Sequence, residues 1–425
     1  MSRDLSRWMP WVRTLSDRII ITRETLKNGL KSPNKQEYLI CARYDEKRMT
    51  QVHLEQESAK NILGNIYIGR VVNIVENLQA AFIEIEKGFA CFYSLKDLKN
   101  PIFTKKNGKK PLCIGDELLV EVTKERIKTK PPMVSTNLNF PGKYLVLTTE
   151  NQVLGISRKL QKEDRDRLKK LIEPQLVSEE FGVVIRTNAS LAKEEEILAE
   201  LEALKTIHRE LLERSRHLTA FSLLRTAEPY YLSFIWGLQL SQVEKITTDI
   251  PEVYEALEVY FREHEKHEIQ KIHLYEDSMV SLSALYSLKH ELERALEKKV
   301  WLPSGGYLVI EPTEALTVID VNSGKDLRKK SKEEMIFSIN MEAAEEIGRQ
   351  LMLRNISGIC VVDFIDMKEK EHQEKLLSAL RKILKMDKNP ATLVDITRLG
   401  LVELTRKRVE KSLREQLEGD EPHEK

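Results

Sequence analysis

The sequence predicts a multidomain protein of mixed α/β (α+β) class. Three observations lead to this prediction: 425 residues exceed the size of one typical domain, 41% hydrophobic residues suffice for real cores, and short strand-like runs alternate with amphipathic helices. About two to four domains are expected at this length. The most informative stretch is residues 314–367, which has a strand–helix–strand pattern in which two apolar runs each end in an aspartate.

Each apolar run delivers a carboxylate where a strand is expected to end. Asp320 follows the run in residues 314–324, and Asp363 follows the run in residues 358–367. In a strand–helix–strand crossover the two strands lie parallel, so both carboxylates are expected at one edge of the same sheet. Two carboxylates at such an edge suit a hard cation, Mg²⁺ or Mn²⁺. The alternative is that each aspartate only caps a strand or turn, which is the commoner role of either one alone.

The segments beside the two runs extend this prediction. Residues 340–358 carry apolar side chains at helical spacing, with Asn340 suited to cap the helix and Gly358 to end it. Asn322, in the turn after the first run, is expected to meet the two aspartates. The next segment, KDLRKKSK at residues 325–332, holds five cations and one anion. Cations beside paired carboxylates favour a phosphodiester substrate, and a solvated loop is the alternative.

Bulk composition excludes some classes of protein. The formal charge is +1, from 68 basic and 67 acidic residues, so only local patches can support nucleic-acid binding. No apolar run approaches the roughly 20 residues of a transmembrane segment, and none is expected. The amino-terminal residues lack the apolar centre of a signal peptide, which predicts a cytoplasmic protein. Peripheral membrane contact through Trp8, Met9 and Trp11 is the weaker alternative.

The cysteines do not indicate a metal site. They are scattered, and none belongs to a CxxC pair: Cys41, Cys91, Cys113 and Cys360. Three of them lie in apolar, strand-like runs and are expected to be core thiols in a reducing compartment. A cysteine zinc site within one chain is therefore not expected.

The chain up to residue 137 predicts an extension, a hairpin and a small barrel. Residues 1–37 are polar and basic with little periodicity and are interpreted as an extension. Residues 38–60 alternate in two short runs around a turn, which predicts a hairpin. Residues 61–137 hold several short, closely spaced strands separated by turn sequences, which is typical of a small barrel such as the OB-fold.

The predicted barrel is the one region where aromatic and basic residues interleave. Its aromatic candidates are Phe82, Phe89, Phe92 and Tyr93, and its cations lie in residues 105–110 and at Lys124, Arg126, Lys128 and Lys130. Aromatic rings beside cations favour single-stranded nucleic acid, because unpaired bases stack on the rings. The alternative, that the rings fill the barrel interior, stays open for each of them.

Residues 138–190 continue as short strands and lead into a helix over residues 191–217. Arg186 and Thr187 end the buried run just before that helix. An arginine and a hydroxyl at a strand end can hold a terminal phosphate. The alternative is a surface ion pair with a helix cap.

The carboxyl-terminal third surrounds the paired aspartates with helices and strands. Residues 283–300 predict an amphipathic helix, and residues 302–306 predict a tight turn that leads into a strand at 307–312. That strand is expected to pair with the first aspartate run. Residues 370–417 are predicted to be mostly helical, with a strand and turn near 393–404, before a polar tail.

The runs around Asp320 and Asp363, together with GNIYIGRVVNIVENLQAAFIEI at residues 64–85, resemble the ribonuclease E/G family on its ribonuclease G-like side. The resemblance covers residues 38–416. It implies a hydrolase and nuclease: an endoribonuclease of RNA processing, including rRNA processing, that cleaves single-stranded, often AU-rich RNA to 5′-phosphate and 3′-hydroxyl products. It also implies magnesium dependence, stimulation by a 5′-monophosphate, and rRNA precursors and mRNA as substrates.

The resemblance also assigns individual residues. The catalytic group would be Asp320 and Asp363 as metal ligands with Asn322 in support. The residues implied for RNA binding are Phe82, Phe92 and Lys130, and those implied for 5′-phosphate sensing are Arg186, Thr187, Gly142 and Val146.

The implied architecture is an RNase H-like fold interrupted by an OB-fold barrel and a 5′-sensor, then a DNase I-like catalytic domain. The corresponding boundaries are an N-terminal extension at 1–37, an RNase H-like subdomain at 38–60 and 226–295, an OB-fold at 61–137, a 5′-sensor at 138–225, a catalytic domain at 296–417 and a polar tail at 418–425.

Two departures from the family pattern limit what the resemblance implies. The CPxC zinc link expected after residue 416 is absent, so zinc-linked dimerisation is not supported and a homo-oligomer of another kind stays open. Residues 188–190, after Thr187, read NAS where a glycine is common, which weakens the expectation of 5′-end sensing. The competing function is a non-catalytic RNA-binding protein, and a second competitor is a nuclease acting on DNA.

Overall fold

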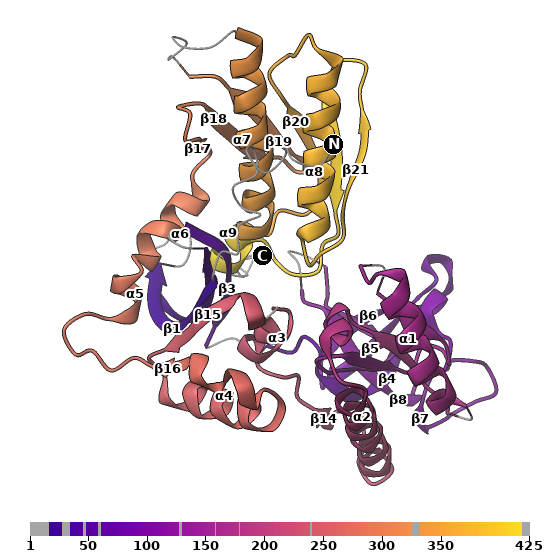
Figure 1. Ribbon diagram of the computed structural model, residues 1–425. Helices are drawn as coiled ribbons and strands as arrows, with labels where there is room; N and C mark the ends of the chain where they lie inside the picture. The colour runs from indigo at the N-terminus through magenta and orange to yellow at the C-terminus, as the bar shows by residue number, and fades with distance from the viewer. Residues whose placement is uncertain are drawn as a thin grey trace. The chain divides into compact units, whose positions relative to one another are not determined.

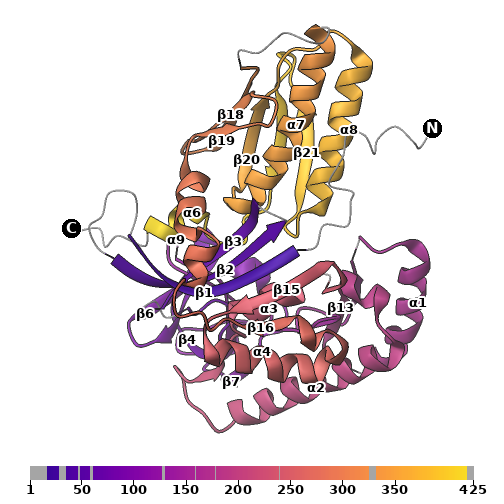
Figure 2. The same cartoon turned by 60° about the vertical axis from the view of Figure 1, so that its left-hand side comes forward.

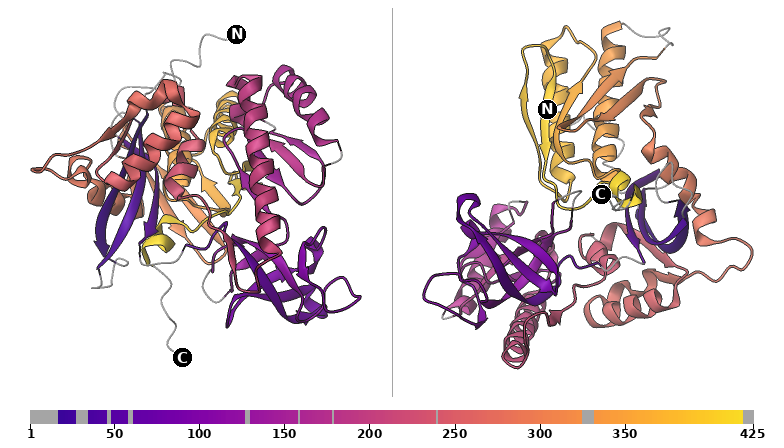
Figure 3. Two further views of the ribbon diagram at one scale, coloured as in Figure 1. Left: turned by 90° about the horizontal axis from the view of Figure 1, so that it is seen from below. Right: turned by 180° about the vertical axis from the view of Figure 1, so that it is seen from behind.

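The computed structural model describes residues 17–27, 35–45, 48–57, 61–126, 130–157, 159–177, 179–238, 240–324 and 332–418. The chain divides into two compact units, one made of Met1–Ala59 with Leu240–Lys425 and one made of Lys60–Gln239. The elements of each unit can be followed in Figures 1, 2 and 3. Within the described ranges, no helix is both long and apolar enough to cross a membrane.

The first unit contains a five-stranded sheet with the order β16-β15-β1-β2-β3. Its strands are β1 (Asp17–Lys27), β2 (Lys35–Asp45), β3 (Arg48–Gln56), β15 (Val243–Thr248) and β16 (Ile272–Leu274). β2 and β3 form the antiparallel hairpin predicted for residues 38–60, whose turn at 46 and 47 lies outside the described residues. The helix α4 (Pro251–His264) follows β15.

The prediction of an extension over residues 1–37 is wrong where the structure describes it. β1 lies inside the sheet, parallel to β15 on one side and antiparallel to β2 on the other. Ile19, Ile20 and Ile21 are all fully buried. A strand covered on both faces shows a continuous apolar run rather than alternation. The run in β1 is only three isoleucines long and is flanked by charged residues, so its sequence did not predict a strand.

The single helix predicted for residues 283–300 is also wrong. The structure has two short helices, α5 (Leu282–Leu285) and α6 (Leu288–Leu296), followed by the strand β17 (Lys299–Trp301). Ser287 between the helices has φ +49°, a left-handed conformation that a continuous right-handed helix excludes.

The aspartate runs belong to a six-stranded sheet with the order β17-β18-β19-β20-β22-β21. The remaining strands are β18 (Tyr307–Pro312), β19 (Leu316–Asn322), β20 (Gly358–Asp363), β21 (Ala391–Ile396) and β22 (Val402–Arg406). The helices α7 (Lys332–Leu353) and α8 (Lys370–Met386) cover one face of this sheet and build its core, and α9 (Leu413–Glu418) follows β22 (Figure 1). The strand–helix–strand prediction is confirmed, because β19 and β20 pair in parallel and β18 forms a hairpin with β19.

The predicted ends of the crossover helix are wrong. α7 begins before Asn340, which is fully buried in the middle of the helix and is not its cap. The helix ends at Leu353, Asn355 adopts φ +48°, and Gly358 (φ +92°) begins β20. An asparagine inside a helix is tolerated when tertiary hydrogen bonds satisfy its amide, and such partners cannot be seen in a local pattern. The basic segment 325–332 lies outside the described residues except for Lys332.

In the second unit, five strands close into a barrel in the order β4-β5-β6-β9-β8, with β8 pairing back to β4. They are β4 (Ile66–Val75), β5 (Ala80–Glu86), β6 (Phe89–Ser94), β8 (Glu117–Lys124) and β9 (Met133–Ser135), and β7 (Phe103–Lys105) and β14 (Leu223–Arg225) extend the sheet. The sequence prediction of a small barrel within residues 61–137 is therefore confirmed (Figure 3).

The remainder of this unit has a four-stranded sheet with the order β10-β11-β13-β12. Its strands are β10 (Asn139–Pro141), β11 (Leu145–Thr148), β12 (Leu154–Ile156) and β13 (Gly182–Ile185), and its helices are α1 (Lys162–Ile172) and α2 (Glu194–Ser215), with α3 (Tyr230–Trp236) further along. The predicted helix over 191–217 is confirmed as α2. The prediction that 138–190 holds only strands is wrong, because α1 is a charged helix that buries only Leu168 and Ile172.

Glu121 makes the stability of this unit depend on pH. Its buried side chain accepts hydrogen bonds from the backbone and side-chain amides of Asn139, and burial raises its pKa from 4.5 to about 7. Protonation of Glu121 therefore makes its full contribution to the stability of the folded state below about pH 4.5. This contribution is lost as the pH rises through about 7. We expect Glu121→Gln to raise the free energy of unfolding at pH 8 by up to about 3 kcal/mol and to change it little at pH 5, as chemical denaturation at the two pH values would measure. The exposed Glu86→Gln is the control, and an equal shift at both pH values would contradict the prediction.

Candidate functional site

The two aspartates are neighbours in the structure. Asp320 and Asp363 are direct partners in the parallel ladder between β19 and β20. Ile319 and Val362, the residues just before them, are fully buried in the core beneath α7 and α8. Because side chains alternate across a strand, both carboxylates point to the opposite, open face of the sheet. Adjacent strands lie about 4.8 Å apart, so the carboxylates are close enough to share one ion.

The electrostatics of the pair agree with this closeness. Partial burial, and then the charges of Asp320 and Asp366, raise the pKa of Asp363. Asn322, two residues beyond Asp320 on the same face, donates a hydrogen bond from Nδ2 to Asp320 Oδ2 at 2.7 Å. The neutral amide thus fixes the orientation of one carboxylate without adding a third negative charge.

The two carboxylates offer oxygen donors, the kind of ligand that hard divalent cations prefer. Among the described residues, no group of three or more His, Cys, Asp or Glu side chains could hold a metal. Mg²⁺ is commonly bound by one or two carboxylates, with water and substrate phosphate completing its shell. A divalent cation held by the two carboxylates would oppose the part of the rise in the pKa of Asp363 that comes from the charge of Asp320.

Asn340 holds the loop that follows Asp363, a role that sequence reasoning missed. Its Nδ2 donates to the carbonyl oxygen of Ile365 at 2.8 Å, and its Oδ1 accepts from the Ile365 amide at 3.1 Å. Glu333, also on α7, accepts hydrogen bonds from the amides of Lys368 and Glu369. The crossover helix therefore positions the segment that carries Asp363 as well as burying its strand.

The barrel presents an aromatic pair on its outer surface. Phe82 on β5 and Phe92 on β6 are direct cross-strand partners, and their rings meet edge to face with centroids 6.2 Å apart. Both side chains are half-buried, whereas Tyr93 is fully buried inside the barrel and donates or accepts a hydrogen bond with Thr136. Phe89 packs against the barrel core. Two of the four aromatic candidates are thus available for stacking.

The row that contains this pair continues around the barrel. Register places Asn73 beside Phe82, Met133 beside Phe92, and Lys124 beside Met133. Lys130 is exposed near the same strands, and Lys128 lies outside the described residues. The barrel surface therefore combines two rings with at least one cation in the same row.

The four 5′-end candidates gather where β11 and β13 meet. Arg186 Nη1 donates to the carbonyl oxygen of Gly142 at 2.5 Å, and the Thr187 hydroxyl lies 3.0 Å from that of Ser157. Val146 is half-buried on β11, opposite Val184. Arg186 thus lies beside the turn that begins at Gly142, whereas the Thr187 hydroxyl lies beside Ser157, after β12.

Glu200 on α2 is the residue here that the sequence did not reveal. Its carboxylate accepts hydrogen bonds from the backbone amides of Lys143, Tyr144 and Leu145 at 2.8–3.0 Å. Burial raises its pKa, while these amides and Arg186 oppose the shift. A Cβ at Gly142 would lie 2.5 Å from Glu200 Oε1, so any other residue there would require the Glu200 carboxylate to move. No sequence pattern distinguishes such a carboxylate from the other acids on a charged helix.

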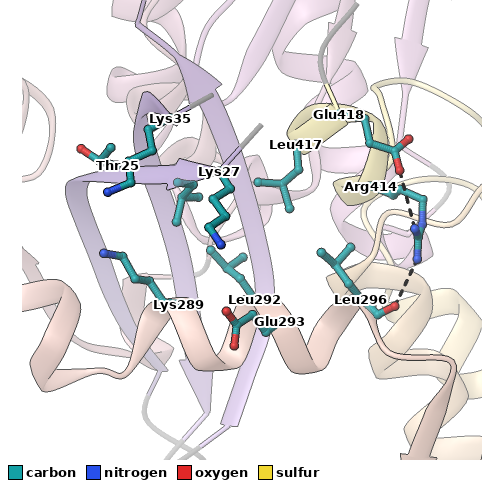
Figure 4. Close-up of a pocket in the computed structure, with 11 residues that line it drawn as sticks. Thr25, Lys27, Lys35, Lys289, Leu292, Glu293, Leu296, Arg414, Leu417 and Glu418 are labelled. Carbon is teal, nitrogen blue, oxygen red and sulfur yellow. Dashed lines mark hydrogen bonds and ion pairs between the residues drawn. The ribbon is translucent and has the colours of Figure 1, made fainter. Parts of the chain in front are cut away.

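The first unit also holds a cavity of about 410 Å³ that is not the candidate site (Figure 4). Its floor is apolar and its rim is mostly basic, and its residues come from β1, β2, α6 and α9: Leu26, Leu292, Leu296 and Leu417, with Thr25, Lys27, Lys35, Lys289, Glu293, Arg414 and Glu418. Neither Asp320 nor Asp363 lines it. The carboxylate pair lies on an open sheet face and not in this cavity.

Comparisons with known proteins agree with the resemblance seen in the sequence. Residues 139–409 match the sequence model of the Ribonuclease E/G family. The chain is 32% identical to Ribonuclease G of Salmonella typhimurium over 408 residues, which cover 92% of this chain and 81% of that protein. It is 34% identical to Ribonuclease G of Haemophilus influenzae (86% and 76% covered) and 32% identical to Ribonuclease E of Buchnera aphidicola (92% and 41% covered).

We expect Asn340→Leu to destabilise the protein by about 2 kcal/mol, because it removes both hydrogen bonds from the fully buried Asn340 side chain to the half-buried backbone of Ile365. Chemical denaturation would measure the loss of stability, and hydrogen exchange would show faster exchange of the Ile365 amide. The exposed Ser378→Ala on α8 should change neither quantity. Unchanged protection of Ile365 would contradict the role given to Asn340.

Proposed function

The chain belongs to the ribonuclease E/G family, and on that premise we propose that it is an endoribonuclease that cleaves single-stranded RNA at Asp320 and Asp363. The observation that carries the proposal is the β19–β20 register, in which the two carboxylates are neighbours on the open face of the sheet. The RNase H-like, OB-fold, 5′-sensor and DNase I-like boundaries remain predictions of the resemblance.

The chemistry needs a divalent cation, and Asp320 and Asp363 would hold it. When bound, Mg²⁺ or Mn²⁺ would neutralise charge on the scissile phosphate and lower the pKa of the attacking water. Asn322 holds the Asp320 carboxylate in one orientation through its 2.7 Å hydrogen bond. Asn340 keeps the backbone beyond Asp363 in place. Attack by water would leave a 5′-phosphate on one product and a 3′-hydroxyl on the other.

Phe82 and Phe92 would bind unpaired bases of the substrate, and Lys130 would contact its phosphates. Stacking of a base on an aromatic ring is typically worth about 1–3 kcal/mol. A base within a duplex cannot turn onto these rings, which accounts for the proposed preference for single strands. The preference for AU-rich RNA, and rRNA precursors and mRNA as substrates, are part of the proposal through the family resemblance.

Arg186 and Thr187 would bind a 5′-monophosphate, with Gly142 and Val146 lining the pocket. An arginine can bind a phosphate through two parallel hydrogen bonds. The three backbone amides of the adjoining turn are already bonded to Glu200. The phosphate would therefore rely on the guanidinium and the hydroxyl.

The proposal predicts cleavage that depends on both a metal and ribose. A fluorescent single-stranded oligoribonucleotide should be cut in Mg²⁺, remain intact with a chelator, and be cut again when Mg²⁺ is restored. Matched oligodeoxyribonucleotide should remain intact. Binding without cleavage under every metal condition would favour the competing function, a non-catalytic RNA-binding protein that uses the aromatic pair alone. Equal cleavage of the deoxy strand would favour a DNA nuclease.

We expect Asp320→Asn and Asp363→Asn each to abolish cleavage, because each variant removes one of the two carboxylates that would hold and position the ion. RNA affinity should change little, since the proposed stacking residues lie on the barrel. Rates from gel assays and affinities from fluorescence anisotropy would test both statements. Asp395→Asn, an exposed aspartate on the same sheet, is the matched control and should cleave normally. Cleavage by either site variant at near the original rate would refute the assignment.

Arg186→Gln should slow cleavage of a 5′-monophosphorylated substrate and spare the same substrate with a 5′-hydroxyl. The reason is that only the first carries the group that the guanidinium would bind. Initial rates on both substrates give the ratio of cleavage of the 5′-monophosphate substrate to cleavage of the 5′-hydroxyl substrate. The exposed Arg165→Gln on α1 should leave this ratio unchanged. Equal slowing of both substrates by Arg186→Gln would exclude 5′-end sensing at this pocket.

A further inference from the structure

An exposed aromatic pair lies on the sheet that carries the two aspartates. Trp301 on β17 and Tyr307 on β18 are direct cross-strand partners, with ring centroids 5.3 Å apart and planes inclined by 60°. Trp301 is 63% exposed, although tryptophan is usually well buried. Their neighbours Val300 and Leu308, on the other face, supply the core packing of these strands. The two rings therefore lie outside the core of this sheet and contact each other on its other face.

The strand register places these rings on the same face as the carboxylates. Tyr307 is the direct partner of Asn322 on β19, so Trp301, Tyr307 and Asn322 form one row across three strands. The adjacent row on that face contains Lys299, Val309, Asp320 and Asp363. Two strand spacings amount to about 10 Å. Trp301 is therefore about 10 Å from Asn322, and Asn322 is hydrogen-bonded to Asp320.

A cation completes the group. Lys299 Nζ lies 4.0 Å from the ring centroid of Trp301 and 3.7 Å from that of Tyr307. Lys299 covers part of the aromatic surface, and the exposed remainder of Trp301 stays open to a ligand. Aromatic faces beside a cation are what proteins use to bind single-stranded nucleic acid: the rings stack bases, and the cation attracts the phosphates.

We infer that Trp301, Tyr307 and Lys299 form a second base-binding site on the catalytic sheet, which takes an unpaired RNA nucleotide close to the scissile phosphate. The inference rests on the proposed function and extends it, because base binding would then occur beside the carboxylates as well as on the barrel. An RNA base is favoured over a protein partner because the rings carry a bound cation and lie within reach of a strand whose phosphate is at Asp320 and Asp363.

The test is a scan of the substrate with single abasic nucleotides on either side of the cleavage site. Affinity would be measured by anisotropy in an Asp363→Asn background and in the same background with Trp301→Ala. Stacking predicts that removing Trp301 weakens binding of the intact oligonucleotide about fivefold or more. At one position near the cleavage site, the abasic substitution should cost as much as the Trp301 change, and the two losses should not add. Trp301→Phe should retain most of the affinity.

The outcomes separate this inference from the proposed function. If the unmodified chain cleaves RNA but Trp301→Ala leaves the affinity and the abasic profile unchanged, the second site is refuted while the ribonuclease stands. If the unmodified chain fails to cleave RNA with any divalent metal, the proposed function itself fails. A change in oligomeric mass with Trp301→Ala, without a change in RNA affinity, would assign the pair to a protein contact instead. Val394→Ala, an exposed residue of the same sheet, is the control and should behave as the unmodified chain.

Discussion

The candidate site depends on the parallel register between β19 and β20. This pairing aligns Asp320 with Asp363, so that two carboxylates more than forty positions apart in the chain become neighbours. A shift of one residue would turn one aspartate toward the core face, because side chains alternate along a strand. The register in turn depends on α7, which covers the back of both strands and buries Ile347 and Leu351 in their core. A Cβ at Gly348 would lie 2.1 Å from Ile383 of α8, so a glycine is needed for the two helices to pack closely.

Buried polar side chains hold the ends of these elements in place. Asn340 fixes the loop after Asp363 from the middle of α7. Arg406 on β22, almost fully buried, donates to Asp387 after α8, to Asn355 after α7 and to the carbonyl oxygen of Ile356. A buried ion pair with all its hydrogen bonds satisfied adds little net stability over apolar packing but penalises any other arrangement. Such a network fits a sheet whose open face has to keep two repelling carboxylates at a fixed separation.

The parts of the chain share one design, in which one face of a sheet builds the core and the other presents polar or aromatic groups. In the barrel, Tyr93 points inward and the neighbouring Phe92 points outward. In the six-stranded sheet, Ile319 points inward and Asp320 outward. The proposed ribonuclease activity would use these outward-facing groups to bind RNA, in each unit by itself. The Trp301 pair would be one more contact of this kind.

The sequence by itself determined the features whose signal is local. The apolar runs ending in Asp320 and Asp363, the helix between them, the barrel strands and the helix α2 all follow from periods of two or 3.6 residues. The tertiary structure decided what depends on distant partners. β1 is a strand because β15, more than two hundred residues away, pairs with it. Asn340 forms hydrogen bonds to a distant loop, and Glu200 forms hydrogen bonds to a distant turn. Trp301 lies on the same sheet face as the carboxylates because of strand pairings that a short stretch of sequence cannot predict. The physical reason is that the spacing of apolar side chains is a property of one segment. The register and burial of that segment depend on the distant segments that pack against it.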